Sequence, residues 1–282
     1  MRRTRGIVAL MVVHGSVDAI PVPEPRLRTG RGAPVLLLHG FLLTWQSWGA
    51  VIDDLAGDHD VFAPTLPGHF GGPPARQPAT IPGLVDHVEA MLDEVGWRTA
   101  HLVGNSLGGW IACELAARGR ATTLTAIAPA GFWPDRPTAE TLIRKFRSFG
   151  PLVGLNTADG LPVMPNMLRS LLIPLLAHQP AVVPNRLANA MAATPAHCTI
   201  IKDLAEDPAI PAGFTKLPEL DLPITILRPE HDRIIPPHFY APDAFTGHPT
   251  LTDRPLPGVG HVPMLEAPTL IASEIRKSIG RA

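Results

Sequence analysis

Proline limits the possible folds of this chain more than any other residue type. The 282 residues include 33 prolines and 25 glycines, spread along the whole sequence. A proline inside a helix removes a backbone hydrogen bond and clashes with the preceding turn, and glycine weakens both helices and strands. Long uninterrupted helices are therefore excluded, and we expect short elements joined by tight turns.

Composition and charge narrow the class of protein. Hydrophobic residues make up 45% and charged residues 17% of the sequence, a balance typical of a globular protein. The 24 basic and 25 acidic residues give a net charge of -1, so we expect no nucleic-acid partner. We also expect no membrane partner, because no stretch of the sequence approaches the roughly 18 apolar residues that a membrane helix needs.

Two features bear on localisation. Cys113 and Cys198 form neither a metal-type nor a redox-type pair, which favours a reducing compartment. Residues 1–13 have the charge order of a secretory signal, but their apolar stretch is short and no A-x-A-like cleavage site follows. An edge strand, or a true start at Met11, is the favoured explanation of the segment, and we predict a cytoplasmic protein.

Short apolar runs alternate with segments of helical period from Pro34 onward. Each run is too short for a helix and is typical of a strand buried on both faces. Between the runs, residues 84–95 and 271–279 repeat apolar side chains at helical spacing. This alternation predicts an α/β protein with a mostly parallel central sheet and helices on both faces. The predicted strands are residues 35–38, 61–63, 101–103, 124–128, 224–227 and, more weakly, 249–251.

The alternation stops between residues 131 and 214. A leucine stripe of helical spacing, interrupted by Pro174, lies in this region. We predict that residues 131–214 form a helical cap inserted into a core of residues 1–130 and 215–282. Because the segment follows one predicted strand and precedes the next, it would lie over the carboxyl edge of the sheet, where ligands bind in open α/β folds.

A candidate nucleophile lies at the end of one predicted strand. The segment Gly104-Asn105-Ser106-Leu107-Gly108 follows residues 101–103 and precedes a helical stretch. This is G-x-S-x-G in the strand–turn–helix context in which a strained turn exposes a serine hydroxyl above the sheet. A helix that begins with small residues would give the same letters, but the context favours Ser106 as a nucleophile.

A serine hydroxyl needs a base that removes its proton. Of twelve histidines, His261 is the best placed, in a glycine-containing loop between the last predicted strand and the final helix. A solvated loop histidine is the alternative. The histidines show no H-E-x-x-H or other metal-binding spacing, so we predict no metal site.

The base in turn needs an acid that orients it. Asp232 directly follows the predicted strand 224–227 and gives the chain order Ser, Asp, His. Glu230 and Asp135 are possible substitutes. For the oxyanion, the turn after residues 35–38 offers the backbone N–H of Phe41, and the residue after the nucleophile offers that of Leu107.

These motifs resemble those of the α/β-hydrolase superfamily, in its cap-bearing branch of esterases and C–C hydrolases. Residues 36–41, 103–109 and 258–261 are similar to its three ordered blocks, and residues 63–69 resemble a fourth. The resemblance covers nearly everything from Pro34 onward. It implies the α/β-hydrolase fold with an inserted helical cap.

The sequence departs from the family pattern at three positions. Thr65 stands where the family usually has Asp, and Phe70 and Pro229 stand where it usually has Gly. The nucleophile also separates relatives, because epoxide hydrolases and haloalkane dehalogenases of the superfamily attack with an aspartate. Ser106 therefore favours acyl chemistry.

We predict a serine hydrolase that cleaves an ester or related acyl bond of a small, apolar substrate and needs no cofactor. Phe41 and Trp133 are candidate substrate contacts. The other apolar residues of the predicted cap that we expect near the substrate are Phe132, Phe146, Phe149, Met164 and Met167.

Two other functions remain open at this stage. The same catalytic residues could cleave a carbon–carbon bond in a β-diketone or dienoate product of aromatic ring cleavage. Such substrates carry carboxylates, so this alternative predicts an arginine in the pocket, with Arg144, Arg147 and Arg186 as candidates. A ligand receptor with an idle triad is the third possibility.

Overall fold

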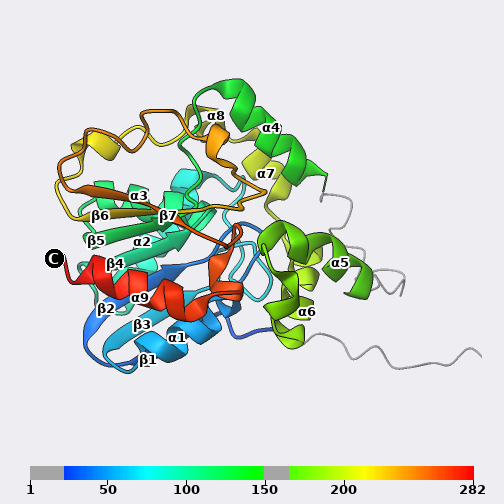
Figure 1. The fold of residues 1–282 in the computed structure, drawn as a ribbon, viewed down its shortest axis with the longest axis horizontal. Helices are drawn as coiled ribbons and strands as arrows, with labels where there is room; N and C mark the ends of the chain where they lie inside the picture. Colours follow the sequence, from blue (N-terminus) through cyan, green and yellow to red (C-terminus); the bar gives the residue numbers. More distant parts are fainter. Residues whose placement is uncertain (1–21, 149–164) are drawn as a thin grey trace, which may run out of the picture.

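A computed structural model describes residues 22–148 and 165–282 of the protein. It contains a seven-stranded sheet flanked by helices, in the strand order β1-β3-β2-β4-β5-β6-β7 (Figure 1). The edge strand β1 is antiparallel to β3, and every other pair of neighbours is parallel. The strands are β1 (Arg26–Gly30), β2 (Ala33–Leu38), β3 (His59–Pro64), β4 (Ala100–Asn105), β5 (Ala121–Ile127), β6 (Ile224–Pro229) and β7 (Leu251–Leu256). The predicted mostly parallel α/β fold is confirmed.

The helices of the described residues are short, as the proline content predicts. The longest is α2, with 14 residues. The α-helices are α1 (Gly49–Leu55), α2 (Ile81–Glu94), α3 (Leu107–Ala117), α4 (Arg136–Arg147), α5 (Pro165–Leu176), α6 (Asn185–Ala193), α7 (Ile201–Glu206), α8 (Ala209–Ala212) and α9 (Pro268–Ile279). Single 3-10 turns occur at Trp45–Trp48, Pro180–Val182, Thr194–His197, Leu217–Glu219, Pro237–Phe239 and Pro263–Leu265.

Helices cover both faces of the sheet. In β2, Leu36 and Leu38 point into the apolar cluster that α2 and α3 build on one face. Val35 and Leu37 point into the second cluster, which contains α1 and α9. Since alternate residues of one strand are buried on opposite faces, β2 reads as a continuous apolar run. This double burial is why the central strands can be predicted from the sequence.

The two edge strands were missed or misplaced by the apolar-run criterion. No run predicts β1, whose side chains alternate between exposed and half-buried. The strand predicted at 249–251 begins only at Leu251 and continues to Leu256, through a polar segment. An edge strand has only one paired neighbour, so it lacks the continuous apolar sequence of a central strand.

The segment between β5 and β6 contains only helices within residues 131–148 and 165–214: α4, α5, α6, α7 and α8, with short 3-10 turns. We call them the β5–β6 helices. Figure 1 shows α4, α5, α6 and α7 gathered beyond one end of the sheet. The two ends of the segment meet, because Phe214 N–H donates to the Gly131 carbonyl at 2.7 Å. The division into a core and a cap stays a prediction that this arrangement supports.

One detail of the leucine stripe differs from the prediction. Pro174 does not interrupt the helix, because α5 continues through it to Leu176. Leu172 is buried and Leu171 is exposed, so only part of the leucine stripe packs against the rest of the protein. The last turn is completed when Ala177 N–H donates to the carbonyl of Ile173.

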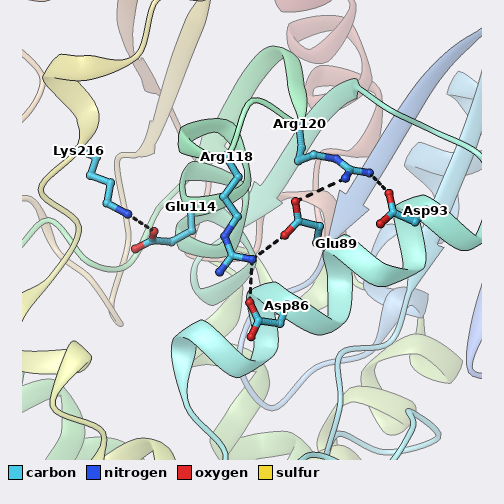
Figure 2. A network of polar contacts seen from close by, with 7 residues as sticks. All are labelled: Asp86, Glu89, Asp93, Glu114, Arg118, Arg120 and Lys216. Atoms are coloured by element: carbon cyan, nitrogen blue, oxygen red, sulfur yellow. Dashed lines mark hydrogen bonds and ion pairs between the residues drawn. The ribbon is translucent and has the colours of Figure 1, made fainter.

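A network of ion pairs joins α2 to the turn between α3 and β5 (Figure 2). Glu89 on α2 lies 2.6 Å from Arg118 and 3.5 Å from Arg120. Asp86 and Asp93, also on α2, pair with the same two arginines. Glu89 is the least exposed of the three acids, with 25% of its side chain exposed, so solvent screens its charge the least.

We predict that Glu89→Gln lowers the free energy of unfolding by about 1 kcal/mol, because it removes the charge shared by both arginines. The matched variant Asp86→Asn should cost less, since 62% of the Asp86 side chain is exposed. Urea unfolding at low and high salt measures both. Equal losses for the two variants would contradict a central role for Glu89.

Candidate active site

The site lies at the carboxyl edge of the sheet, where the chain changes direction. From β2 the chain moves outward to β3 and then returns to form β4 on the other side of β2. The loops after β2 and β4 therefore leave a crevice between them, the usual ligand position in open α/β sheets. Phe41 follows β2 and Ser106 follows β4, so both line this crevice.

Ser106 occupies a strained turn between β4 and α3. Its φ is +54° and its ψ is -115°, a conformation that residues other than glycine rarely adopt. Hydrogen bonds fix this turn, since Ser106 N–H donates to the Ile127 carbonyl and the Ser106 carbonyl accepts from Trp110 and Ala130. A strained backbone conformation persists only where the surrounding structure holds it, and such residues are often found at functional sites.

The two glycines of the motif are required by close backbone contacts. A Cβ atom on Gly104 would lie 2.1 Å from the Gly108 carbonyl oxygen, and one on Gly108 would lie 2.3 Å from the Leu38 carbonyl oxygen. Real Cβ atoms do not approach backbone oxygens so closely. The first turn of α3 therefore packs directly against β4 and against the end of β2.

His261 is hydrogen-bonded to Asp232. The distance from His261 Nδ1 to Asp232 Oδ2 is 2.7 Å. The other carboxylate oxygen of Asp232 accepts from the backbone N–H groups of Ile234 and Ile235, both at 2.8 Å. A neutral imidazole that donates Nδ1–H to a carboxylate has Nε2 as its acceptor nitrogen. Ser106 is 4%, Asp232 5% and His261 4% exposed.

The other two acids considered from the sequence are engaged elsewhere. Asp135 caps α4 by accepting from Thr138 N–H at 2.9 Å. Glu230 accepts from Gly258 N–H at 2.9 Å and is exposed. Asp232 is therefore the carboxylate that the structure brings to His261.

The loop after β2 is held by a buried histidine. His39 Nδ1 lies 2.8 Å from the Gly40 carbonyl, and its Nε2 accepts from Leu66 N–H at 2.8 Å. Burial lowers the pKa of His39 well below its usual value, and the nearby His69 lowers it further, so the ring is neutral. With both nitrogens occupied, His39 braces the loop and is not available as a base.

Two backbone N–H groups, one on each side of the crevice, lack an acceptor in the part of the chain that the structure describes. Within the described residues, neither Phe41 N–H nor Leu107 N–H has a hydrogen-bond acceptor. The next residue, Leu42, has a φ of +63°. Its carbonyl accepts from the hydroxyl of Thr194, which follows α6. The β5–β6 helices thus help to fix the turn that contains Phe41.

Two residues that hold the His261 loop escaped the sequence analysis. Asn105 donates from Nδ2 to the His261 carbonyl at 2.9 Å, so the residue before Ser106 is tied to the histidine loop. Glu266 accepts from the N–H groups of Gly260, His178 and Gln179, at 2.5, 3.1 and 2.7 Å. Its carboxylate joins the histidine loop to the end of α5. Nothing in the residues around Glu266, five positions after His261, indicates from the sequence that its carboxylate holds this loop.

Ser106 lines two adjoining cavities. The larger, of about 60 Å³, lies between the core and the helices α4, α7 and α8, and it is bounded by Leu107, Trp110 and Trp133. The smaller, of about 40 Å³, also contains His261 and is closed by Leu172, Leu175 and Met191 from α5 and α6. Among the described lining residues of either cavity there is no lysine, arginine, aspartate or glutamate.

Some of the expected substrate contacts line the cavities and others do not. Phe41 lines both cavities and Trp133 lines the larger one, where its indole N–H donates to the Ile210 carbonyl. Phe146 lines both cavities as well, whereas Phe132 lines neither and packs in the core. Phe149 and Met164 lie outside the described residues, as do residues 1–13 and the side chain of Met167.

The candidate arginines and the two cysteines lie away from the cavities. Arg144, Arg147 and Arg186 are exposed and line neither cavity. Cys113 and Cys198 are buried free thiols, and burial raises the pKa of Cys198 to about 12. Over residues 22–148 and 165–282, no helix could span a membrane and no cluster of three metal-ligating side chains occurs.

Known proteins resemble this chain over most of its length. A model of the alpha/beta hydrolase family matches residues 35–274. Epoxide hydrolase EphH of Mycobacterium tuberculosis is 37% identical over 201 residues, which are 70% of this chain and 93% of that protein. The 2-hydroxymuconate semialdehyde hydrolase of a Pseudomonas species is 36% identical over 94 residues, 32% of this chain and 33% of that protein. A thermophilic esterase from Thermogutta terrifontis has a TM-score of 0.72 at 25% identity, covering 90% of this chain and 92% of that one.

The fold and these relatives define a hydrolytic enzyme built on a parallel α/β sheet. The chain belongs to the alpha/beta hydrolase family, since the family model spans most of this chain. The match to the Mycobacterium tuberculosis protein also covers 93% of that protein's length. This confirms the resemblance drawn from the sequence blocks around His39, Ser106 and His261.

We predict that Glu266→Ala lowers kcat for the protein's hydrolytic reaction by about 10²-fold with little change in KM, because the displaced loop moves the His261 ring. Glu266→Gln keeps one carbonyl acceptor and should recover part of the loss. The matched control is Glu230→Gln, whose carboxylate holds only Gly258 of the same loop. If both glutamate sites gave equal losses, a special role for Glu266 would be ruled out.

Proposed function

We propose that the protein is a carboxylesterase-like serine hydrolase that cleaves small, uncharged, apolar esters through an acyl-enzyme. The observation that carries the proposal is the placement of Ser106 and His261 in one apolar cavity, with the His261 ring hydrogen-bonded to Asp232. No other nucleophile of the described residues lines both cavities at the carboxyl edge.

The reaction proceeds in two acyl transfers. Ser106 Oγ attacks the ester carbonyl carbon while its proton moves to His261 Nε2, and Asp232 stabilises the imidazolium through the Nδ1–H bond. The oxyanion accepts from the N–H groups of Phe41 and Leu107. His261 then protonates the departing alcohol oxygen, the C–O bond breaks, and a water molecule repeats the sequence to release the acid.

The lining of the cavities favours an ester over a ring-cleavage product. A dienoate substrate carries a carboxylate, and burying it without a cationic partner is costly. Neither cavity has an arginine or lysine among its described lining residues, and the three candidate arginines are exposed. An uncharged substrate needs no such partner.

The nucleophile argues against epoxide hydrolysis despite the similarity to a protein of that name. Attack of a serine oxygen on an epoxide carbon would form an ether, which water does not cleave near neutral pH. An aspartate would instead form an ester that water can hydrolyse. With Ser106 at this position, acyl substrates are the ones that can turn over.

We predict that the protein hydrolyses short and medium p-nitrophenyl esters and reacts with a fluorophosphonate probe. Ser106→Ala should lose the label and lower kcat by up to about 10⁶-fold, because the nucleophile is gone. An epoxide such as styrene oxide should show no turnover. Labelling by the probe without ester turnover would point to C–C hydrolysis. Tight ligand binding with neither probe labelling nor ester turnover would point to a receptor.

We also predict that Asp232→Asn lowers kcat by about 10⁴-fold, because the amide no longer selects the tautomer with the proton on Nδ1. Asp135→Asn is the matched control, since this residue caps α4 and does not contact His261. Stopped-flow and steady-state assays with the same ester measure both. A larger loss in the Asp135 variant would overturn the assignment of the acid.

A further inference from the structure

Two aromatic rings in contact, those of Phe41 and Phe146, line both cavities that contain Ser106. The rings of Phe41 and Phe146 meet edge to face, with centroids 5.0 Å apart and an interplanar angle of 77°. They are also shared by the linings of both cavities. Phe41 follows β2 and Phe146 belongs to α4, so the contact bridges the core and the β5–β6 helices. The pair therefore forms part of the wall of each cavity, at the place where the two cavities adjoin.

The position of His261 tells the two cavities apart. His261 lines the smaller cavity and is absent from the lining of the larger one. In acyl transfer the departing alcohol oxygen must take its proton from the histidine, so the alcohol portion has to leave on the side of the imidazole. The acyl chain then extends from the same carbonyl carbon in the other direction.

We infer that the larger cavity binds the acyl chain, that the smaller cavity binds the alcohol chain, and that Phe146 with Phe41 sets the boundary between them. The inference rests on the proposed acyl transfer at Ser106. It names the substrate class as neutral esters with an alkyl group on each side of the carboxyl. In this arrangement Phe146 is a specificity-determining residue.

The chemistry of the walls supports this substrate class. The larger cavity contains Leu142, Ile143 and Ile210, and the smaller contains Leu175, Leu176 and Met191. Alkyl chains gain free energy in both, because each buried methylene contributes about 0.8 kcal/mol. Both cavities therefore favour hydrocarbon.

The test uses two isomeric esters with the long chain on opposite sides. Ethyl hexanoate has a six-carbon acyl chain, and hexyl acetate has a six-carbon alcohol chain. Hydrolysis is followed by proton release, and the readout is the ratio of kcat/KM for ethyl hexanoate to that for hexyl acetate.

Two matched variants each fill one cavity. Ile143→Trp narrows only the larger cavity, and Leu175→Trp narrows only the smaller; both positions are half-buried. We expect Ile143→Trp to lower the ratio by about tenfold or more and Leu175→Trp to raise it by a similar factor. Leu171→Trp is the control, because Leu171 is 60% exposed on α5 and lines neither cavity. It should leave the ratio unchanged.

The boundary is tested by adding Phe146→Ala to Ile143→Trp. Without the Phe146 ring the acyl chain can pass into the other cavity, so the ratio should return to within about threefold of the wild type, whereas Phe146→Leu should restore less. Shifts of the opposite sign, or no shift with either tryptophan variant, would overturn the assignment. Failure of the wild type to hydrolyse both isomers would instead count against the proposed esterase function.

Discussion

The close packing of α3 against the end of β2 is the constraint on which the site depends. Gly108 lies so near the Leu38 carbonyl that only a glycine can occupy the position. This contact brings Leu107 beside the turn that contains Phe41. The strained backbone of Ser106 follows from the same packing, since hydrogen bonds from Trp110 and Ala130 to its carbonyl hold the turn.

The β5–β6 helices are hydrogen-bonded to the loops around Phe41 and His261 at several points. Thr194 binds the Leu42 carbonyl, Glu266 joins Gly260 to the end of α5, and Val262 N–H donates to the Leu176 carbonyl at 2.8 Å. These helices therefore do more than cover the sheet. They line both cavities and hold the loops of the proposed oxyanion donor and base, so the proposed function couples substrate preference to the geometry of the site.

Family membership and chemistry are determined by different parts of the molecule. Proteins similar to this chain include ones named as an epoxide hydrolase, a semialdehyde hydrolase and an esterase, and the esterase shares its fold. A shared sheet only presents side chains at one edge, and function depends on which side chains those are. Here the serine at position 106 and the uncharged walls of the cavities carry the argument for esters.

The sequence by itself determined the strands β2 to β6 and the position of Ser106 in its strand–turn–helix motif. These features are local, because a strand buried on both faces and a glycine-flanked turn each leave their signal in consecutive residues. The edge strand β1 gave no such signal, and the weak signal at residues 249–251 misplaced β7. Only the tertiary structure decided that Asp232, not Glu230 or Asp135, meets His261, that Glu266 and Asn105 hold the histidine loop, and that the ring of Phe146 meets that of Phe41. Each of these contacts joins side chains from different elements, so it depends on how those elements pack and leaves no pattern along the chain.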